Sequence, residues 1–168
     1  MVITAATAVN KNAQAFENQI TARDERYLDS MKRLSNAIKS EGALSILQLH
    51  HGGRMNVPGL YPNQDIVCPS SIKANRDYAV EPRELKTSEV YDIIDDFVRS
   101  AKIAIKAGFD GIELHGANTY LLQQFFSPNS NQRDDEFGGS IEKRMKFGLT
   151  LVKRMIKLKK KYAKKEFI

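Results

Sequence analysis

Three short apolar segments alternate along this chain with longer segments in which apolar residues recur at helical spacing. The apolar segments are 2–7, 43–49 and 108–116, and each has the length of a buried strand. Strands that are apolar throughout and alternate with amphipathic helices indicate a parallel sheet joined by right-handed crossovers. The alternation therefore predicts an α/β fold built on a parallel sheet.

Three amphipathic helices are expected between and after these strands. The first runs from about Asp24 to near Gly42, the second from Thr87 as its N-cap to the C-terminal glycine Gly108, and the third over 141–165. Phe167 and Ile168 then look like the first residues of a fourth strand. The apolar positions are Tyr27, Met31, Leu34 and Ile38 in the first helix, Val90, Ile94, Phe97, Ala101 and Ile105 in the second, and Phe147, Leu151, Met155, Leu158 and Tyr162 in the third.

Two long irregular segments, 51–87 and 117–140, both follow strands. The first contains four of the five prolines and has no helical period. Long loops inside a compact domain usually carry function, and α/β proteins place their sites at the carboxyl ends of the strands. A TIM barrel needs eight βα units and roughly 250 residues, so 168 residues with about three units are too few for a complete barrel.

Composition excludes several classes of protein. With 42% hydrophobic and 27% charged residues, the chain is typical of a folded globular protein. No segment approaches the roughly 20 apolar residues of a membrane helix, and no secretory signal follows Met1. The single cysteine, Cys68, cannot form an internal disulfide, which fits a reducing cytoplasm. We therefore expect a cytoplasmic protein without a membrane anchor.

The net charge of +6 comes from one short run near the C-terminus. Residues 153–165 hold eight basic side chains and no acidic one, and the rest of the chain has 18 basic and 20 acidic residues. Most of these lysines fall on the face of the third helix opposite its apolar positions, so a solvated helix face is the preferred interpretation. A patch that binds nucleic acid or an anionic membrane ranks behind it, and we expect neither partner.

The residues offer little support for a metal site or a phosphate loop. His50 and His51 are adjacent at a strand end, so their side chains leave on opposite faces and cannot easily share one metal ion. The chain contains neither G-x-G-x-x-G nor a P-loop lysine. We expect no bound metal.

Four polar residues near strand ends could carry chemistry. His115 ends the third strand, and a tight turn could direct Asn118 toward the same point, where two donors would polarise a carbonyl oxygen. Tyr120 could supply a proton as a general acid. A hydrogen-bonded strand-end histidine and a core tyrosine are equally compatible with this spacing. Gln48 suits the edge of a heterocycle such as a flavin pyrimidine, or a hydrogen bond to a neighbouring loop.

The segment IELHGANTYLLQQFFSPNSNQRDDEFGGSIEKRMKF, 112–147, closely resembles the signature region of the old yellow enzyme family of FMN-dependent oxidoreductases, also called NADH:flavin oxidoreductases. ILQLHHGGR, 46–54, and VITAATAV, 2–9, are similar to the third and second barrel strands of that family. The resemblance implies a TIM barrel with FMN at its C-terminal face. Residues 1–168 would form one incomplete domain, a partial barrel of about strands two to five of the eight.

The resemblance also implies roles for individual residues. Gln48 would hydrogen-bond the flavin pyrimidine, and the backbone of Ala6 would lie against the flavin. His115 and Asn118 would bind the carbonyl oxygen of the substrate, and Tyr120 would protonate its α-carbon. NAD(P)H would reduce FMN, which would pass hydride to the β-carbon of an activated alkene such as an enone. Quinones and other electron-poor acceptors are alternatives.

A second group of residues in the same region is expected to be structural, as a loop and helix start that seals the barrel face. Asp135 and Glu136 add acid to this turn, and Lys143 stands where relatives usually have asparagine. The matching residues are Arg133, Asp134, Phe137, Gly138, Gly139 and Arg144.

The resemblance further implies that parts of the barrel lie outside these 168 residues. The first strand and helix, and the later strands with an arginine near the flavin and the phosphate loops, have no counterpart here. The chain is thus expected to be an internal piece of such an enzyme, active when it self-associates or is completed by another half-barrel. The alternative is a non-catalytic remnant without autonomous FMN binding.

Overall fold

In the computed structural model, which describes residues 1–163 and 167–168, a parallel sheet forms the centre of the chain. Its strands are β1 (Val2–Ile3), β2 (Thr7–Ala8), β3 (Ser45–His50) and β6 (Gly111–Leu114). The central strand β3 pairs with β1 and β2 along one edge and with β6 along the other. The central strand β3 therefore lies between the preceding strands β1 and β2 and the later strand β6.

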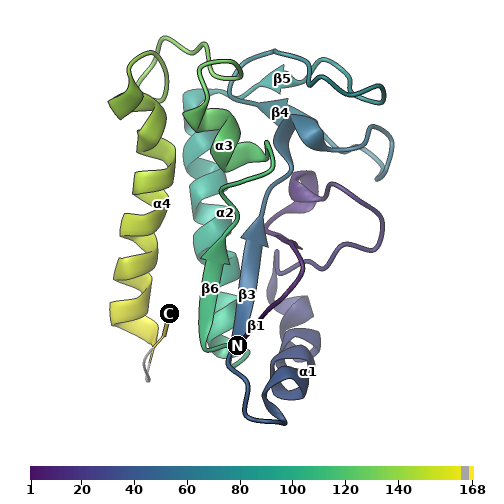
Figure 1. The fold of residues 1–168 in the computed structure, drawn as a ribbon, viewed down its shortest axis with the longest axis vertical. Helices are drawn as coiled ribbons and strands as arrows, with labels where there is room; N and C mark the ends of the chain where they lie inside the picture. The colour runs from purple at the N-terminus through teal and green to yellow at the C-terminus, as the bar shows by residue number, and fades with distance from the viewer. Residues whose placement is uncertain (164–166) are drawn as a thin grey trace.

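Three long helices cover one face of this sheet. They are α1 (Leu28–Lys39), α2 (Thr87–Lys106) and α4 (Ile141–Tyr162). Figure 1 shows α2 behind β3 and β6, with α4 on one flank and α1 on the other. Helices on a single face and strands in sequential order are the arrangement of a barrel, whereas a doubly wound sheet has helices on both faces. The predicted α/β fold is confirmed as a sector of a (β/α)8 barrel.

The first predicted strand, 2–7, was expected to be one buried element, and this was wrong. It is divided into β1 and β2, because four residue steps from Ile3 to Thr7 face only three steps along β3. The extra residue is a β-bulge, where the Thr4 hydroxyl accepts the Gln48 N–H at 3.1 Å. Val2 is 45% exposed and Ile3 is 42% exposed.

The predicted helices are present, with one corrected boundary. Lys86, not Thr87, is the N-cap of α2, and its backbone N–H donates to the Glu89 carboxylate at 2.7 Å. Thr87 lies in the first turn, where its hydroxyl donates to Asp135 at 2.6 Å. Asp24 caps a short 3-10 helix, η2 (Glu25–Tyr27), directly before α1.

The two irregular segments contain short elements that the sequence pattern did not predict. The segment after β3 contains the 3-10 helix η3 (Gly53–Met55) and a parallel pair of two-residue strands, β4 (Val67–Cys68) and β5 (Arg83–Glu84). The segment after β6 contains α3 (Leu121–Phe126), whose six residues are too few to show a helical period. A further 3-10 helix, η1 (Lys11–Ala13), follows β2. All of these except η1 lie beyond the carboxyl ends of β3 and β6 (Figure 1).

Helix α4 begins at the N-cap Ser140 and buries three of the five predicted apolar positions, Phe147, Leu151 and Leu158. Met155 is half-buried, and Tyr162 is 38% exposed. Its basic residues from Lys153 to Lys161 are exposed, and Lys164 and Lys165 lie outside the described residues. No helix in the described part of the chain is long and apolar enough to cross a membrane. A second apolar row on α4 is exposed: Ile141, Met145, Leu149, Val152 and Ile156.

The last two residues behave as the start of another parallel strand. Ile168 donates its N–H to the Asp110 carbonyl at 2.9 Å, and its own carbonyl accepts the Ile112 N–H at 3.0 Å. Phe167 is buried. This hydrogen-bond pattern places Ile168 beside β6, as predicted.

The Arg133 side chain forms hydrogen bonds with three separate segments of the chain. Its guanidinium donates to the Pro69 carbonyl at 2.9 Å, to the Leu85 carbonyl at 2.5 Å and to the Asp135 carboxylate at 2.6 Å. The Arg133 side chain is 4% exposed, and its guanidinium holds the pKa of Asp135 well below the usual range. Asp135, which the sequence analysis counted as added acid, is therefore a partner in this cluster. Arg133 has the structural role that was predicted for it.

Replacing Arg133 with methionine should destabilise the fold by about 3–5 kcal/mol, because it removes one partner of a buried ion pair and leaves two carbonyls unsatisfied. Arg154→Met is the matched control, since Arg154 pairs with Asp95 at 3.6 Å on the surface, and it should cost less than about 1 kcal/mol. Urea unfolding measures both. Equal effects would contradict a structural role for the buried cluster.

Candidate active site at the carboxyl ends of β3 and β6

Three rings meet where β3 and β6 end. The centroid of His50 lies 4.3 Å from that of Tyr120 and 5.5 Å from that of His115, and His115 lies 4.9 Å from Tyr120. All three pairs are edge-to-face. His50 is fully buried, whereas His115 and Tyr120 are half-buried. The parallel pairing of β3 with β6 brings these side chains together from positions far apart in the sequence.

The hydrogen bonding of His115 fixes which ring nitrogen can donate. Its Nδ1 accepts the Ala117 N–H at 3.3 Å, so the proton of the neutral ring is on Nε2. Burial lowers the pKa of His115 below its ordinary value, although the carboxylate of Glu113 opposes this shift. The ring is therefore neutral at neutral pH and presents Nε2–H as a donor.

His50 is a member of this site that the sequence analysis missed, because it considered His50 only as a metal ligand. Its Nδ1 lies 3.0 Å from the Gln19 amide nitrogen, which donates to it and places the ring proton on Nε2. His50 Nε2 is buried and has no hydrogen-bond partner among the described residues. Burial, and then the neighbouring His115, lower the pKa of His50 to about 3. The alternation of β3, which puts His50 on the same face as Gln48, was the available signal.

Ala6 is linked to the same network. The Gln19 amide donates to the Ala6 carbonyl at 3.0 Å, and the Gln19 side-chain oxygen accepts the Ala15 N–H at 2.7 Å. Gln19 is 5% exposed. A single buried amide therefore holds Ala6 and the His50 ring together.

The tight turn expected after His115 is present. The Tyr120 N–H donates to the Ala117 carbonyl at 3.1 Å, and the two residues between them have positive φ, 55° at Asn118 and 61° at Thr119. Asparagine tolerates this left-handed conformation, but the β-branched Thr119 is strained there. The turn brings the Tyr120 ring back onto His115, while the Asn118 side chain is exposed. No hydrogen bond joins Asn118 to His115 among the described residues.

The strained turn is held by two glutamines of α3. The Gln123 side-chain oxygen accepts the Thr119 N–H at 2.6 Å, and the Gln124 amide donates to the Thr119 carbonyl at 2.6 Å. The Gln124 amide also donates to the Gly52 carbonyl at 3.1 Å, and its oxygen accepts the Arg54 N–H at 3.3 Å. Gln124, which is 1% exposed, therefore connects the turn after β6 to the turn after β3.

Gln48 lies two residues before His50 on β3, and only the nitrogen of its side-chain amide is hydrogen-bonded among the described residues. Its amide donates to the Glu113 carboxylate at 2.9 Å, across the pair of residues that face each other in β3 and β6. Its side-chain oxygen makes no hydrogen bond within the described residues. That oxygen and the unpartnered His50 Nε2–H offer an acceptor and a donor to a planar heterocycle. The described residues therefore fit the ring of a flavin.

Comparison with known proteins gives the same architecture. Residues 1–160 match the profile of the NADH:flavin oxidoreductase / NADH oxidase family. The sequence is 42% identical over 168 residues to the probable NADH-dependent flavin oxidoreductase YqiG of Bacillus subtilis. The aligned region covers 100% of this chain and 45% of that protein. It is 46% identical over 154 residues to the NADH:fumarate oxidoreductase of Klebsiella pneumoniae, with 92% of this chain and 17% of that protein covered.

Among solved structures, morphinone reductase in complex with tetrahydroNAD superposes with a TM-score of 0.87 at 31% sequence identity. The match covers 93% of this chain and 47% of that one. The likeness confirms the predicted partial TIM barrel. The chain spans less than half the length of these relatives.

Thr119→Gly should stabilise the fold by about 0.5–1 kcal/mol, because glycine adopts positive φ without the steric penalty that threonine has there. Asn118→Gly, at the neighbouring positive-φ residue, should change the free energy of unfolding by only a few tenths. Urea denaturation measures both variants. A destabilised Thr119→Gly protein would show that the turn is not strained as described.

Lowering the pH from about 7 to about 5 should destabilise the fold, although carboxylates titrate only at lower pH. Burial lowers the pKa of His50 and of His51 to about 3 from the ordinary 6.5. Between these values the unfolded chain binds more protons than the folded one, so stability falls as the pH falls. We expect a loss of about 2 kcal/mol for each histidine between about pH 7 and pH 5.

The measurement is urea unfolding as a function of pH, with His50→Gln as the comparison. That variant should lose markedly less stability over the same interval, since His50 no longer contributes to the loss. A free energy of unfolding that stays constant from about pH 7 to pH 5 would contradict the burial of these rings.

Proposed function

Because this chain belongs to the NADH:flavin oxidoreductase / NADH oxidase family, we propose that it acts in an FMN-dependent oxidoreductase that reduces an activated alkene with NAD(P)H. The resemblance of the signature region to the old yellow enzyme family is thereby confirmed. The observation that supports the proposal most is the ring cluster at the ends of β3 and β6, which presents the His115 Nε2–H and the Tyr120 hydroxyl together. A relative named for fumarate supports an electron-poor alkene as the acceptor.

The proposed cofactor contacts are Gln48 and the backbone of Ala6. The free side-chain oxygen of Gln48 would accept a ring N–H of FMN, and the buried His50 Nε2–H would donate to a ring or substrate oxygen. When bound, FMN supplies the hydride-carrying centre of the reaction. Glu113 orients the Gln48 amide from the neighbouring strand.

The proposed substrate contacts are His115 and Asn118. A neutral His115 donates its Nε2–H to the carbonyl oxygen of an enone, and the exposed Asn118 amide adds a second donor. These donors stabilise the negative charge that the oxygen gains as the β-carbon receives hydride. The Tyr120 hydroxyl then gives its proton to the α-carbon and regains one from water. Overall, NAD(P)H and one proton are consumed, and the alkene is saturated.

The exposed apolar row on α4 bears on how this activity is completed. The match to YqiG covers 45% of that protein, and an apolar row on α4 is exposed here. We therefore propose that activity needs self-association or a complementing half-barrel, in a cytoplasmic location where the buried thiol of Cys68 stays reduced. The exposed row also supports the alternative of a remnant that does not bind FMN by itself.

The test is a titration of the folded chain with FMN, followed by an assay of cyclohexenone reduction with NADH and NADPH. Tyr120→Phe should lower the rate of alkene reduction by about 100-fold or more, because it removes the general acid, and should leave the FMN dissociation constant unchanged. Tyr78→Phe, at a tyrosine that is 44% exposed, is the matched control.

Gln48→Ala should instead weaken FMN binding by about tenfold, the effect of losing one buried hydrogen bond. Saturable binding with these two separate effects would support the proposal. Failure of a folded chain to bind FMN would favour the remnant, and an active Tyr120→Phe variant would exclude Tyr120 as the proton donor.

A further inference from the structure

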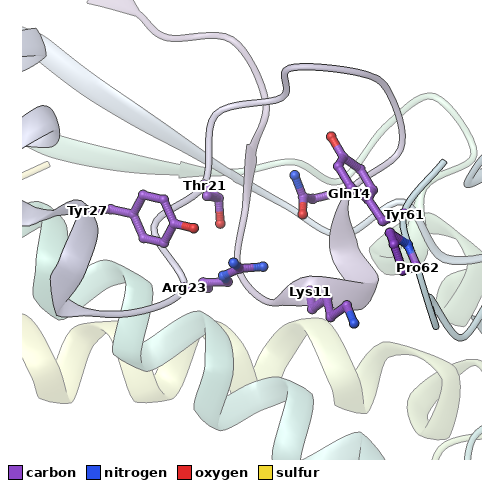
Figure 2. A pocket seen from close by; sticks show the side chains of 7 residues that line it. All are labelled: Lys11, Gln14, Thr21, Arg23, Tyr27, Tyr61 and Pro62. Carbon is purple, nitrogen blue, oxygen red and sulfur yellow. The ribbon is translucent and has the colours of Figure 1, made fainter.

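A separate pocket of about 340 Å³ lies beside η1, and none of the site residues proposed above lines it. It is formed by the segment after β2, the residues before α1 and the loop that contains Tyr61 and Pro62. Figure 2 shows the Arg23 guanidinium and the hydroxyls of Thr21 and Tyr27 directed toward the space between them, with the Lys11 stem along the lower wall. Of the described residues, two cationic side chains, Lys11 and Arg23, and no acidic side chain line this pocket.

Arg23 is held in place with its guanidinium available. Its backbone carbonyl accepts a hydrogen bond from Arg99 at 2.7 Å, and its guanidinium lies 5.5 Å from the centroid of the Tyr27 ring. The neighbouring carboxylate, Asp24, accepts two hydrogen bonds from Arg26 at 3.0 and 2.8 Å, and Arg26 lowers the pKa of Asp24 to about 2. Arg23 approaches Asp24 only at 3.7 Å, through Nε. Within the described residues its terminal nitrogens make no hydrogen bond, and they can bind an anion.

A buried amide supplies a second, independent indication of a ligand. Gln14 is 7% exposed, and Figure 2 shows its amide at the side of the pocket next to Tyr61. The side chain of Gln14 makes no hydrogen bond with any described residue; only its backbone carbonyl is used, by Gln64. The residue is largely buried, and its side-chain amide opens into the pocket, where a ligand or water can bond it. Gln14 can donate to an anion that Arg23 binds.

The remaining walls indicate what the anion is attached to. A cavity of about 340 Å³ is at the lower end of the range for organic ligands and larger than a phosphate group needs. Tyr61 and Pro62 give an apolar wall, and the Tyr61 hydroxyl donates to the Phe16 carbonyl at 3.2 Å, which fixes the ring. Aromatic walls of this kind stack on planar rings.

We propose that this pocket binds a phosphate monoester that carries a planar ring, of the size of a mononucleotide. Arg23 and Lys11 bind the phosphate, Gln14 donates to it, and Tyr61 contacts the ring. Arginine is suited to the phosphate because its fork of N–H groups matches two phosphate oxygens. The site does not depend on the oxidoreductase function proposed above.

Isothermal titration calorimetry of the full chain with adenosine 5′-monophosphate, inorganic phosphate and adenosine tests this. We expect saturable binding of adenosine 5′-monophosphate, at least tenfold tighter than that of phosphate or adenosine. Arg23→Gln should weaken it by at least tenfold. Arg33→Gln, which removes the same charge from an exposed position on α1, should leave it unchanged. Lys11→Gln, at an exposed side chain whose loss cannot unfold the chain, should also weaken it.

Absence of saturable binding would overturn the proposal, and so would equal weakening by Arg23→Gln and Arg33→Gln, which is the result of a general charge effect. Phosphate that binds as tightly as the nucleotide would exclude the ring contact. Gln48→Ala separates this site from the proposed flavin site, because it should leave binding of adenosine 5′-monophosphate unchanged. Loss of both FMN and nucleotide binding in that variant would contradict two independent sites.

Discussion

The parallel pairing of β3 with β6 is the interaction on which the rest of this structure depends. It is the longest strand contact in the sheet, running from Ile46 opposite Gly111 to Leu49 opposite Leu114. One face of the pair packs on α2 and the other presents Gln48 beside Glu113. Because the register is fixed, the two strands end together, and the residues that follow them must meet. The buried side-chain amides of Gln19 and Gln124, near the carboxyl ends of these strands, then hold those residues in one geometry.

Much of the fold follows from periodicity, and the failures have physical causes. The helices and the central strands were predicted because they bury continuous apolar faces in the helix layer. Helix α3 escaped prediction because one and a half turns show no period, and β4 and β5 because two-residue strands show no alternation. The first strand is interrupted near Thr4 because the Thr4 hydroxyl, and not a backbone carbonyl, accepts the Gln48 N–H. A hydropathy pattern does not predict such a contact. Lys86 caps α2 through its backbone, with Glu89 as acceptor.

The site residues that directly follow a predicted strand could be placed from the sequence. His115 and Tyr120 follow an apolar strand and do lie together, and the turn between them was expected. The supporting residues were not foreseen, because Gln19 and Gln124 act through contacts with segments distant in sequence. His50 was set aside as a failed metal ligand. Only the three-dimensional structure shows it buried against Tyr120.

The central claim is that the carboxyl ends of β3 and β6 form a packed polar site within these residues. An NMR titration of the imidazole resonances tests it most directly, since the chain has three histidines. We predict that His50 and His51, with pKa values lowered to about 3, show no titration above about pH 5, and that His115 titrates below its ordinary range. Three histidines that titrate together near 6.5 would mean that the site is open to water, and would contradict the account.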